Sequence, residues 1–276
     1  MYKEYIELQK KCQEIRYLII DILGDLGVGH VGGCLSIVEA LVTIYYKHMR
    51  IDPANPKMEG RDRFVLSKGH AGPALYAVLA DKGFFQKDML YTLNRPGTRL
   101  PSHADMLRTP GIDMTTGSLG QGLSCALGIA VGARIKKDGA NVYTIIGDGE
   151  SQEGQIWEAA LYATQMKLDN LIVFTDFNGL QIDGTIAQIN GLEPLEKKWE
   201  AFGWHTTVVD GHSIDEIDKA IERAKTATGR PNMIILKTTK GKGVSFIEEA
   251  GIANHNMALS DTMHQTALAE IRGVRT

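Results

Sequence analysis

Apolar residues along the chain follow two spacings that alternate from one end to the other. Recurrence at every third or fourth position predicts helices over residues 5–23, 36–48, 73–82, 122–137, 152–166, 195–202, 214–226 and 259–272. Short, nearly continuous apolar runs predict buried strands at residues 63–66, 141–146, 171–175, 206–209 and 232–238. Because strands alternate with helices, we expect an α/β fold with a central, largely parallel sheet and helices on both faces.

Segments rich in glycine, proline and polar residues interrupt this pattern and predict loops. They cover residues 53–61, 94–111, 186–191 and 239–244, and residues 27–33 form a glycine-rich turn. Residues 246–256 favour no element. The helix over 122–137 is rich in small side chains, which is typical of a helix buried against the sheet or packed across a subunit interface. No repeat or linker divides residues 1–276, so we expect a single domain.

Composition narrows the class of protein. With 276 residues, of which 43% are hydrophobic, the chain can bury one large core. A net charge of −3 gives no reason to expect a nucleic-acid or membrane-surface partner. No apolar run reaches transmembrane length, and the mixed-charge N-terminus does not resemble a signal peptide. Cys12, Cys34 and Cys125 lack metal-site spacing, so we expect buried free thiols and a cytoplasmic protein.

Two polar residues follow predicted strands in the middle of the chain. Asp148, between two glycines, follows the strand at 141–146, and Asn178 follows the next strand, 178 − 148 = 30 residues later. Both should lie at the carboxyl edge of the sheet, where open α/β sheets bind ligands. A carboxylate and an amide oxygen there suit Mg²⁺, which completes its coordination with phosphate oxygens and water. Gly-Asp-Gly alone is typical of a tight turn, but with Asn178 it predicts a metal-bridged diphosphate.

Glycine turns and histidines extend this candidate site. The turn at 117–122 precedes a helix, and helix N-termini favour diphosphates. His30, His70, His103 and His255 each occupy a glycine-rich or loop segment. Taken singly, such a histidine is more often structural. Four of them together suit hydrogen bonding to phosphate and sugar oxygens and proton transfer near neutral pH.

Three other charged residues admit two interpretations. Glu153 lies in the first turn of a predicted helix, where the helix dipole alone favours a carboxylate. Lys240 and Lys242 fit either a contact with an anion or a solvated turn.

These motifs resemble the N-terminal half of transketolase over nearly the whole chain, and they include a thiamine diphosphate motif. The resemblance rests on five motifs in the expected order: Gly29-His30-x-Gly32-Gly33, Asp62-Arg63-Phe64-x-Leu66-Ser67-Lys68-Gly69-His70-Ala71, Thr116-Gly117-Ser118-Leu119-Gly120-Gln121-Gly122, Gly147-Asp148-Gly149-x-x-Gln152-Glu153-Gly154 and Asn178-x-x-x-Ile182-Asp183-Gly184. The glutamate at 153 favours transketolase over the related deoxyxylulose-phosphate synthases, which usually lack it.

The resemblance implies a role for each residue of the candidate site. The expected ligands of Mg²⁺, or of Ca²⁺ in its place, are Asp148, Asn178 and the carbonyl of Leu180. The residues expected to contact thiamine diphosphate are His70, Gly117, Ser118, Leu119, Gly149, Glu150 and Asn178. The expected catalytic residues are His30, His103 and His255, which face the sugar, and Glu153. Glu153 is expected to join Glu158 in a carboxylate network that links two active sites across a dimer interface.

The resemblance also implies that this chain supplies only part of an enzyme. Transketolases are more than twice as long, and their second domain binds the aminopyrimidine and supplies the glutamate that activates the cofactor. We therefore expect a partner chain with the pyrimidine and C-terminal domains, in an α2β2 assembly, and no activity without it. The expected reaction transfers a two-carbon ketol unit from a ketose to an aldose.

Two segments depart from the usual transketolase pattern. Ser102-His103-Ala104 replaces Gly-His-Pro, and Asn254-His255-Asn256 replaces Trp-His-Gly. Both should lie near the sugar channel, so we expect a branched or differently substituted ketose as donor. The alternatives are a synthase of the deoxyxylulose-phosphate type and a non-catalytic module that binds thiamine diphosphate. A NAD-binding fold is disfavoured, because no G-x-G-x-x-G follows an early strand.

Overall fold

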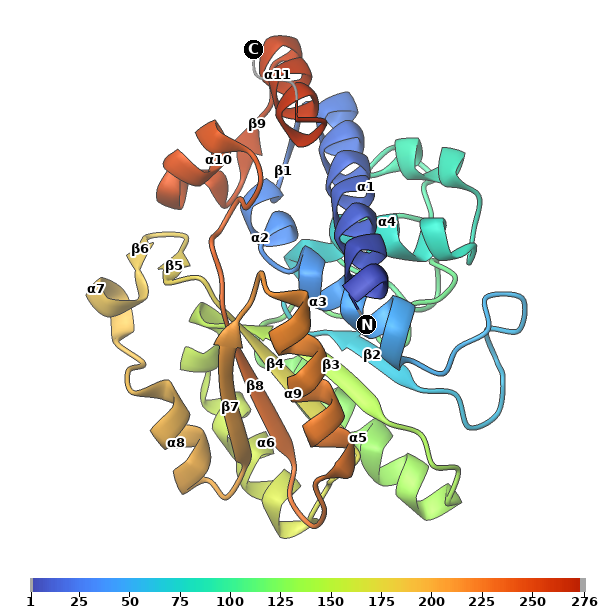
Figure 1. Ribbon diagram of the computed structural model, residues 1–276, viewed down its shortest axis with the longest axis vertical. Helices are drawn as coiled ribbons and strands as arrows, with labels where there is room; N and C mark the ends of the chain where they lie inside the picture. Colours follow the sequence, from blue (N-terminus) through green and yellow to red (C-terminus); the bar gives the residue numbers. More distant parts are fainter. Residues whose placement is uncertain (1, 274–276) are drawn as a thin grey trace.

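The chain folds around a parallel sheet of five strands. The structure is a computed structural model that describes residues 2–273. Within them, the strand order is β2-β3-β4-β8-β7, and all neighbouring pairs are parallel (Figure 1). The strands are β2 (Arg63–Leu66), β3 (Val142–Gly147), β4 (Leu171–Phe177), β7 (His205–Asp210) and β8 (Asn232–Lys237). Each coincides with a predicted apolar run, so the α/β class is confirmed.

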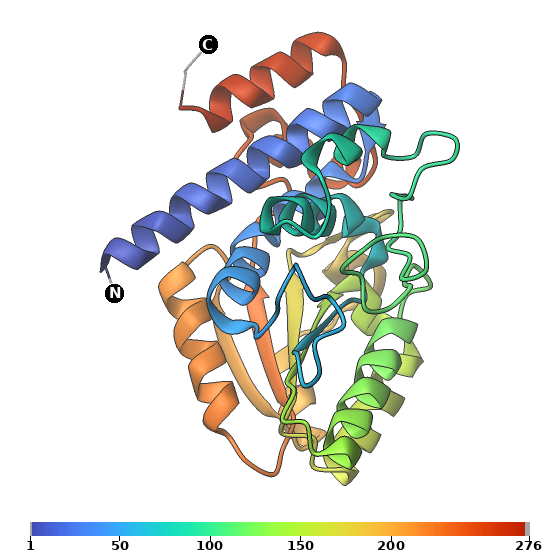
Figure 2. The ribbon, with the colours of Figure 1, turned by 90° about the vertical axis from the view of Figure 1, so that its right-hand side faces the viewer.

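Helices cover both faces of this sheet and form two hydrophobic cores. The first core contains α1 (Tyr2–Leu26), α3 (Val38–Thr43), α4 (Gly72–Lys82), α9 (Ile214–Thr226) and α11 (Asp261–Ile271). The second contains α5 (Gln121–Lys136), α6 (Gly154–Gln165) and α8 (Leu195–Ala201). In Figure 2, α1 lies across the other helices of the first core, and α11 packs alongside it.

Side chains of each strand alternate between the two cores. In β2, Phe64 and Leu66 face the first core, whereas Val65 faces the second. In β3, Tyr143 faces the first core and Ile146 the second. Because both faces of the sheet are covered, these strands appear in the sequence as continuous apolar runs rather than as apolar–polar alternation.

The helical segment near the N-terminus differs from the prediction of one helix over 36–48. It begins with α2 (Val31–Leu35), inside the predicted glycine turn, continues with α3 and ends in a π-helical turn, Ile44–His48. Gly32 and Gly33 disfavour a helix in isolation, but both are buried in close contact with neighbouring side chains. Tertiary packing therefore overrides local propensity here.

Two further segments are helical where the sequence predicted a loop or no element. The loop predicted at 186–191 is α7 (Ile186–Asn190), which begins with a capping box between Thr185 and Gln188. Residues 246–256 contain α10 (Ser245–Glu249) and a 3-10 helix, Gly251–Asn254. Other 3-10 helices cover Gly69–Ala71, Lys87–Thr92 and Gly149–Gln152.

Four two-residue strands escaped prediction because they are too short to show a period. β1 (Val28–Gly29) pairs antiparallel with β9 (Met257–Ala258), and β5 (Leu180–Gln181) pairs antiparallel with β6 (Gly184–Thr185). The first pair brings the segment before His30 next to the segment after His255. The second pair forms a small hairpin after β4.

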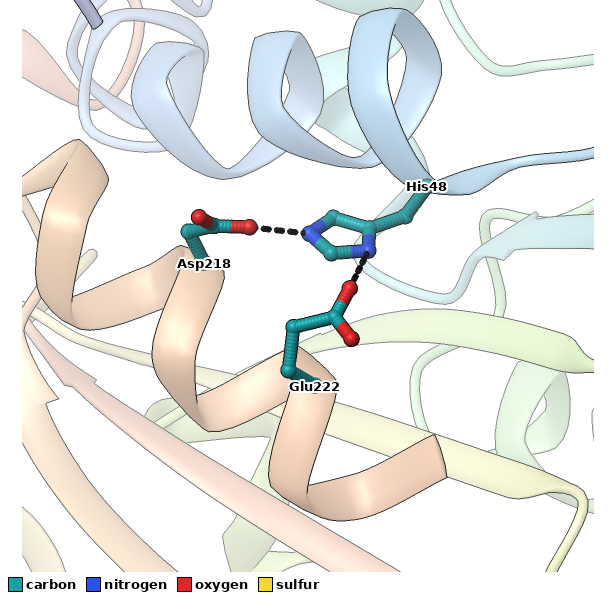
Figure 3. A group of neighbouring side chains, drawn as sticks. All are labelled: His48, Asp218 and Glu222. Atoms are coloured by element: carbon teal, nitrogen blue, oxygen red, sulfur yellow. Dashed lines mark hydrogen bonds and ion pairs between the residues drawn. The ribbon is translucent and has the colours of Figure 1, made fainter. Parts of the chain in front are cut away.

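A buried histidine ties the π-helical turn to α9 (Figure 3). The Nε2 atom of His48 lies 2.8 Å from Asp218 Oδ1, and its Nδ1 atom lies 3.3 Å from Glu222 Oε1. The Lys225 ammonium is 3.1 Å from Nδ1, and the Lys47 ammonium is 3.1 Å from Asp218 Oδ2. The two carboxylates approach different nitrogens of the ring, and the Lys47 ammonium pairs with Asp218. These contacts form a network of hydrogen bonds and ion pairs between the two elements.

The cysteine prediction is right for two residues. Cys12 and Cys34 are buried free thiols, but Cys125 is partly exposed. Cys125 lies on α5, which buries Leu123, Ala126 and Ala130 against the sheet and leaves Gly128 exposed on its outer side. The small-residue helix is thus buried on one face only. No helix within residues 2–273 is long and apolar enough to cross a membrane.

Candidate active site

A cavity of about 360 Å³ opens where β2, β3 and β4 end. The sequence predicted polar residues at this carboxyl edge, and the structure brings most of them together. The predicted site residues that line the cavity are His30, His70, His103, Gly117, Leu119, Asp148, Gly149, Glu150, Glu153, Asn178, Leu180 and His255. Ser118 is exposed and does not line it.

Asp148 and Asn178 follow adjacent strands, as expected. Asp148 Oδ1 accepts a hydrogen bond from the Gly149 N–H at 2.8 Å, and Oδ2 accepts one from the Gly179 N–H at 2.6 Å. Burial, together with the nearby Asp176 carboxylate, raises the pKa of Asp148 to about 7. Asn178 Oδ1 accepts from the Leu180 N–H at 3.1 Å. A cation bound by this carboxylate and by the amide oxygen of Asn178 would stabilise the ionised form of Asp148.

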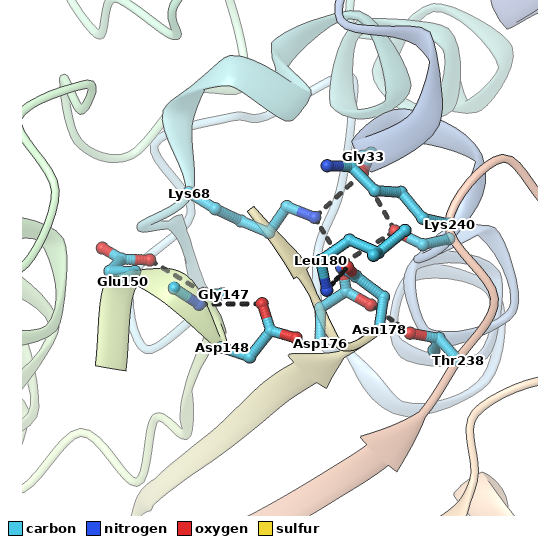
Figure 4. A network of polar contacts seen from close by, with 12 residues as sticks. Gly33, Lys68, Gly147, Asp148, Glu150, Asp176, Asn178, Leu180, Thr238 and Lys240 are labelled. Atoms are coloured by element: carbon cyan, nitrogen blue, oxygen red, sulfur yellow. Dashed lines mark hydrogen bonds and ion pairs between the residues drawn. The ribbon is translucent and has the colours of Figure 1, made fainter. Parts of the chain in front are cut away.

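The centre of the polar network is a residue that sequence analysis did not assign, Asp176, near the end of β4 (Figure 4). Its carboxylate, which is fully buried, accepts hydrogen bonds from Lys68 Nζ, from Ser36 Oγ at 2.7 Å and from Asn178 Nδ2 at 3.0 Å. Burial alone would raise the pKa of Asp176, but Lys68 and these donors hold it below its ordinary value. The bond to Asn178 fixes the orientation of the amide, so Asp176 acts as a support for the candidate metal ligand.

The glycine turn at 117–122 approaches the end of β2 closely. A Cβ atom on Gly69 would lie 2.8 Å from the Gly117 nitrogen, and one on Gly122 would lie 2.4 Å from Ser67 Oγ. Glu150 accepts from Ser67 Oγ at 2.6 Å, from the Gly120 N–H at 2.9 Å and from the Gly147 N–H at 3.0 Å. Its acceptors are occupied within the chain, so Glu150 joins the two glycine turns together.

The four predicted histidines form one cluster. The ring centroid of His30 lies 5.5 Å from that of His70, 6.1 Å from that of His103 and 5.4 Å from that of His255. Burial, followed by repulsion from Lys68, lowers the pKa of His70 well below its ordinary value. Burial and Lys240 lower the pKa of His255 to about 4, and burial also lowers the pKa of His30. Near pH 7 these three rings are neutral, so each can donate one hydrogen bond and accept another.

Lys240 belongs to this cluster, and Lys242 does not. The Lys240 side chain is buried, and its ammonium lies 3.2 Å from His255 Nδ1. Burial and the charge of Lys68 lower the pKa of Lys240 to about 8. Lys242 is partly exposed and pairs weakly with Glu248 at 3.9 Å. The anion-contact interpretation therefore fits Lys240, and the solvated turn fits Lys242.

The rim of the cavity contains Glu153 and the hairpin formed by β5 and β6. Glu153 lies in an exposed position just before α6, and Glu158 is exposed farther along that helix. Gln152 Nε2 donates to Gln181 Oε1 at 2.7 Å and to the Asn190 carbonyl at 2.9 Å, which holds the hairpin beside the Gly-Asp-Gly turn.

The residues that sequence analysis left without a role are Lys68, Asp176 and Gln181. One signal was available for Lys68: it stands between a predicted buried strand and a glycine-histidine pair. Asp176 gave a similar signal, because it directly follows the predicted apolar run at 171–175. Gln181 gave none, because its contact depends on a hairpin of two-residue strands.

Comparisons with known proteins agree with this geometry. Residues 8–271 match the protein family described as "Transketolase, thiamine diphosphate binding domain". A 6-deoxy-6-sulfo-D-fructose transketolase subunit of Clostridium sp. strain MSTE9 is 58% identical over 98% of this chain and 98% of its own length. One of the subunits of an apulose-4-phosphate transketolase from Phocaeicola vulgatus is 38% identical over 98% of this chain and 95% of its own length.

Solved structures give the same result. The crystal structure of transketolase from Campylobacter jejuni matches 96% of this chain with a TM-score of 0.88 and 31% sequence identity. The chain spans only 42% of that protein. The fold, the family match and the lengths of the relatives named as subunits all agree. The chain therefore belongs to the transketolase family and corresponds to the thiamine diphosphate binding domain of that family.

Proposed function

We propose that this chain is the N-terminal subunit of a cytoplasmic, thiamine diphosphate-dependent transketolase that works with a separate partner chain. The observation that carries the proposal is the convergence of Asp148, Asn178 and four histidines on one cavity. The two relatives named as subunits match this chain over nearly their whole length, whereas the Campylobacter transketolase is more than twice as long. We infer that the partner chain carries the pyrimidine and C-terminal domains, in an α2β2 assembly.

The residues present fit a divalent cation at the carboxyl edge of the sheet. Asp148, Asn178 and the backbone carbonyl of Leu180 would hold Mg²⁺, or Ca²⁺ in its place, because all three offer oxygen ligands. The raised pKa of Asp148 supports this assignment, since a bound cation would stabilise the ionised carboxylate. Beside this site, His70 and the backbone at Gly117, Leu119 and Gly149 line the space that a diphosphate would occupy.

When bound, thiamine diphosphate supplies the electron sink for breaking and forming the carbon–carbon bond. The chain contributes the surroundings of the sugar. Neutral imidazoles at His30 and His255 can hold or move the protons of sugar hydroxyl groups, and His103 lies at the exposed side of the cluster. Glu153, at the rim, would link this site to the second site across a dimer interface.

For the substrate, we propose a ketose donor substituted at the end remote from its carbonyl, of the 6-deoxy-6-sulfofructose type. The support is the 58% identity to a relative named for that sugar, together with the departures at Ser102-His103-Ala104 and Asn254-His255-Asn256. Both relatives named as subunits carry the names of donors other than the unbranched sugar phosphates expected of most transketolases.

The test is ketol transfer by the chain alone and after mixing with its partner chain, with thiamine diphosphate and Mg²⁺. Donors to compare are 6-deoxy-6-sulfofructose, apulose 4-phosphate and xylulose 5-phosphate. We expect activity only in the mixture and preference for the sulfonated donor. Asp148→Asn should abolish activity, and Asp88→Asn, at an exposed residue outside the cavity, should not. Activity without the partner, or pyruvate-dependent synthesis instead of ketol transfer, would contradict the proposal.

A further inference from the structure

Asn254 lies at a point where two segments of the candidate active site are joined. Its side chain is fully buried at the end of the 3-10 helix before His255. The Nδ2 atom donates to the Lys240 carbonyl at 3.1 Å and to the Ile247 carbonyl at 2.8 Å. Both donor positions of the amide are therefore used, one of them on the loop that holds Lys240. The Oδ1 atom has no hydrogen-bond partner among the residues that the structure describes.

A third segment, α2, packs against the same side chain. A Cβ atom on Gly32 would lie 2.2 Å from Asn254 Oδ1, so the amide rests directly on the glycine backbone. The Gly32 carbonyl in turn accepts a hydrogen bond from the Gly241 N–H at 3.0 Å, next to Lys240. Because α2 begins just after His30, this contact connects the position of that histidine to the other two segments.

The three segments supply three groups that meet in the cavity. The Lys240 ammonium lies 3.2 Å from His255 Nδ1, and the rings of His30 and His255 are 5.4 Å apart. The antiparallel pairing of β1 with β9 joins the segment that leads into His30 to the segment that follows His255, with Gly29 opposite Met257. Asn254 therefore joins the Lys240 loop to the His255 segment by hydrogen bonds and packs against the third segment, α2.

We infer that Asn254 is a positioning residue, whose side-chain amide holds the Lys240 loop and the His255 segment against α2. A buried acceptor without a partner is unfavourable, and an apolar side chain would avoid it. An apolar side chain would instead leave the carbonyls of Lys240 and Ile247 without this donor, so the two N–H groups of the amide are the part of Asn254 that stabilises the structure.

Asn170 provides a matched control away from the site. Its Nδ2 atom also donates to two backbone carbonyls, those of Ala130 at 3.1 Å and Ala140 at 3.2 Å, and its Oδ1 atom is also without a partner among residues 2–273. It precedes β4, at the opposite end of the sheet from the cavity. Asn254→Asp and Asn170→Asp each replace the two donors by a carboxyl group of the same shape, so a general effect of the substitution should appear in both variants.

The first readout is hydrogen exchange of the chain without cofactor, which does not depend on the proposed function. In Asn254→Asp we expect exchange across residues 239–258, the Gly241 amide included, to be about 10-fold faster or more, because the segment opens locally. Asn170→Asp should leave that segment unchanged and affect residues around 130–140 and 170. If Asn254→Asp does not fold, Asn254→Ala replaces it. Equal exchange of residues 239–258 in the variant and the unmodified chain would overturn the inference.

The second readout rests on the proposed function and uses the mixture with the partner chain. At saturating thiamine diphosphate, we expect Asn254→Asp to lower kcat by about 10-fold, because proton-transfer groups are misplaced, with a smaller change in donor KM. Asn170→Asp should retain kcat. A kcat loss of the same size in both variants would also overturn the inference. Absence of ketol transfer in the unmodified mixture would instead contradict the proposed function and leave the exchange result standing.

Discussion

Two lysines of one loop, Lys240 and Lys242, show how burial separates residues that the sequence treats alike. Both stand in the same glycine-lysine segment, but only Lys240 is buried beside the histidine cluster. A buried ammonium beside the proposed diphosphate site would interact strongly with an anion, whereas an exposed ammonium is screened by water. The difference gives a prediction that uses Lys242 as its control.

Lys240→Met should weaken the binding of thiamine diphosphate by about 10- to 100-fold, the loss expected for a hydrogen bond to a charged group. The pKa of Lys240 is about 8, and the diphosphate favours its charged form. Affinity of the unmodified protein should therefore be highest below pH 8 and should fall as the pH rises above it. Calorimetric titrations in the presence of Mg²⁺ and the partner chain, from pH 7 to 9.5, measure both effects.

Lys242→Met should bind thiamine diphosphate as the unmodified protein does, with the same dependence on pH. An equal loss of affinity in both variants would mean that the loop acts through its general charge. A pH dependence that survives in Lys240→Met would assign it to another group.

At this scale, the candidate metal ligands could be predicted because they follow apolar runs, and the histidines because they lie in glycine-rich or loop segments. Asp148 and Asn178 could be found because each follows an apolar run, and the parallel sheet then places them together. Asp176 and Lys68 also follow predicted strands, but their role could not be assigned from the pattern. It depends on their contact with each other and on the hydrogen bond from Ser36, which is 140 positions from Asp176 in the chain. Long-range hydrogen bonds of this kind leave no local spacing.

At the scale of elements, the strands were predicted well because burial on both faces gives an apolar run that few other structures share. The short helices were not. α2 contains two glycines, and α7 has five residues, too few to display a helical period. Their formation depends on packing in the first case and on a capping box in the second. The network around His48 joins two elements in the same non-local way, and its effect on stability can be measured.

Stability should fall as the pH falls through about 6.5, and His48 should account for part of the fall. Burial, followed by repulsion from Lys225, lowers the pKa of His48 in the folded protein, against the attraction of Asp218 and Glu222. Below pH 6.5 the unfolded chain binds a proton that the folded chain resists, so the free energy of unfolding decreases, by at most about 1.4 kcal/mol per pH unit for one group. Denaturant unfolding at pH 7.5, 6.5 and 5.5 measures this slope.

In His48→Gln the slope between pH 6.5 and 5.5 should be smaller than in the unmodified chain, although the variant is less stable at pH 7.5 because Asp218 loses a partner. His205→Gln, at an exposed residue of β7, serves as the control for the histidine-to-glutamine substitution itself. Identical slopes in His48→Gln and the unmodified chain would show that His48 does not titrate differently on folding.

At the scale of the whole molecule, one edge of the sheet collects polar groups from segments spread over residues 30–255, and two helices keep apolar surface exposed. On α6, Leu161 and Tyr162 are exposed, and on α5, Ile135 is exposed. The sequence left two interpretations of α5 open, burial against the sheet or packing across a subunit interface, and these exposed apolar positions are compatible with the second. The prediction at this scale concerns how completely the described chain forms the cofactor site.

Thiamine diphosphate and Mg²⁺ should stabilise this chain strongly only when the partner chain is present. Under the proposed function, this chain holds the metal and the diphosphate, and the surface for the aminopyrimidine lies on the partner. A ligand at 100 times its Kd stabilises the folded state by about 2.7 kcal/mol, and a ligand near its Kd contributes little. Thermal unfolding of the chain, the partner and their mixture, each with and without both ligands, should therefore show a large upward shift of Tm for the mixture alone. Asp148→Asn should remove that shift and should also lower the Tm without ligands by a smaller amount, because the amide nitrogen cannot accept one of the two N–H bonds that Asp148 accepts from Gly149 and Gly179. An equally large shift for the isolated chain would mean that it binds the whole cofactor itself, and a shift that persists in Asp148→Asn would place the metal elsewhere.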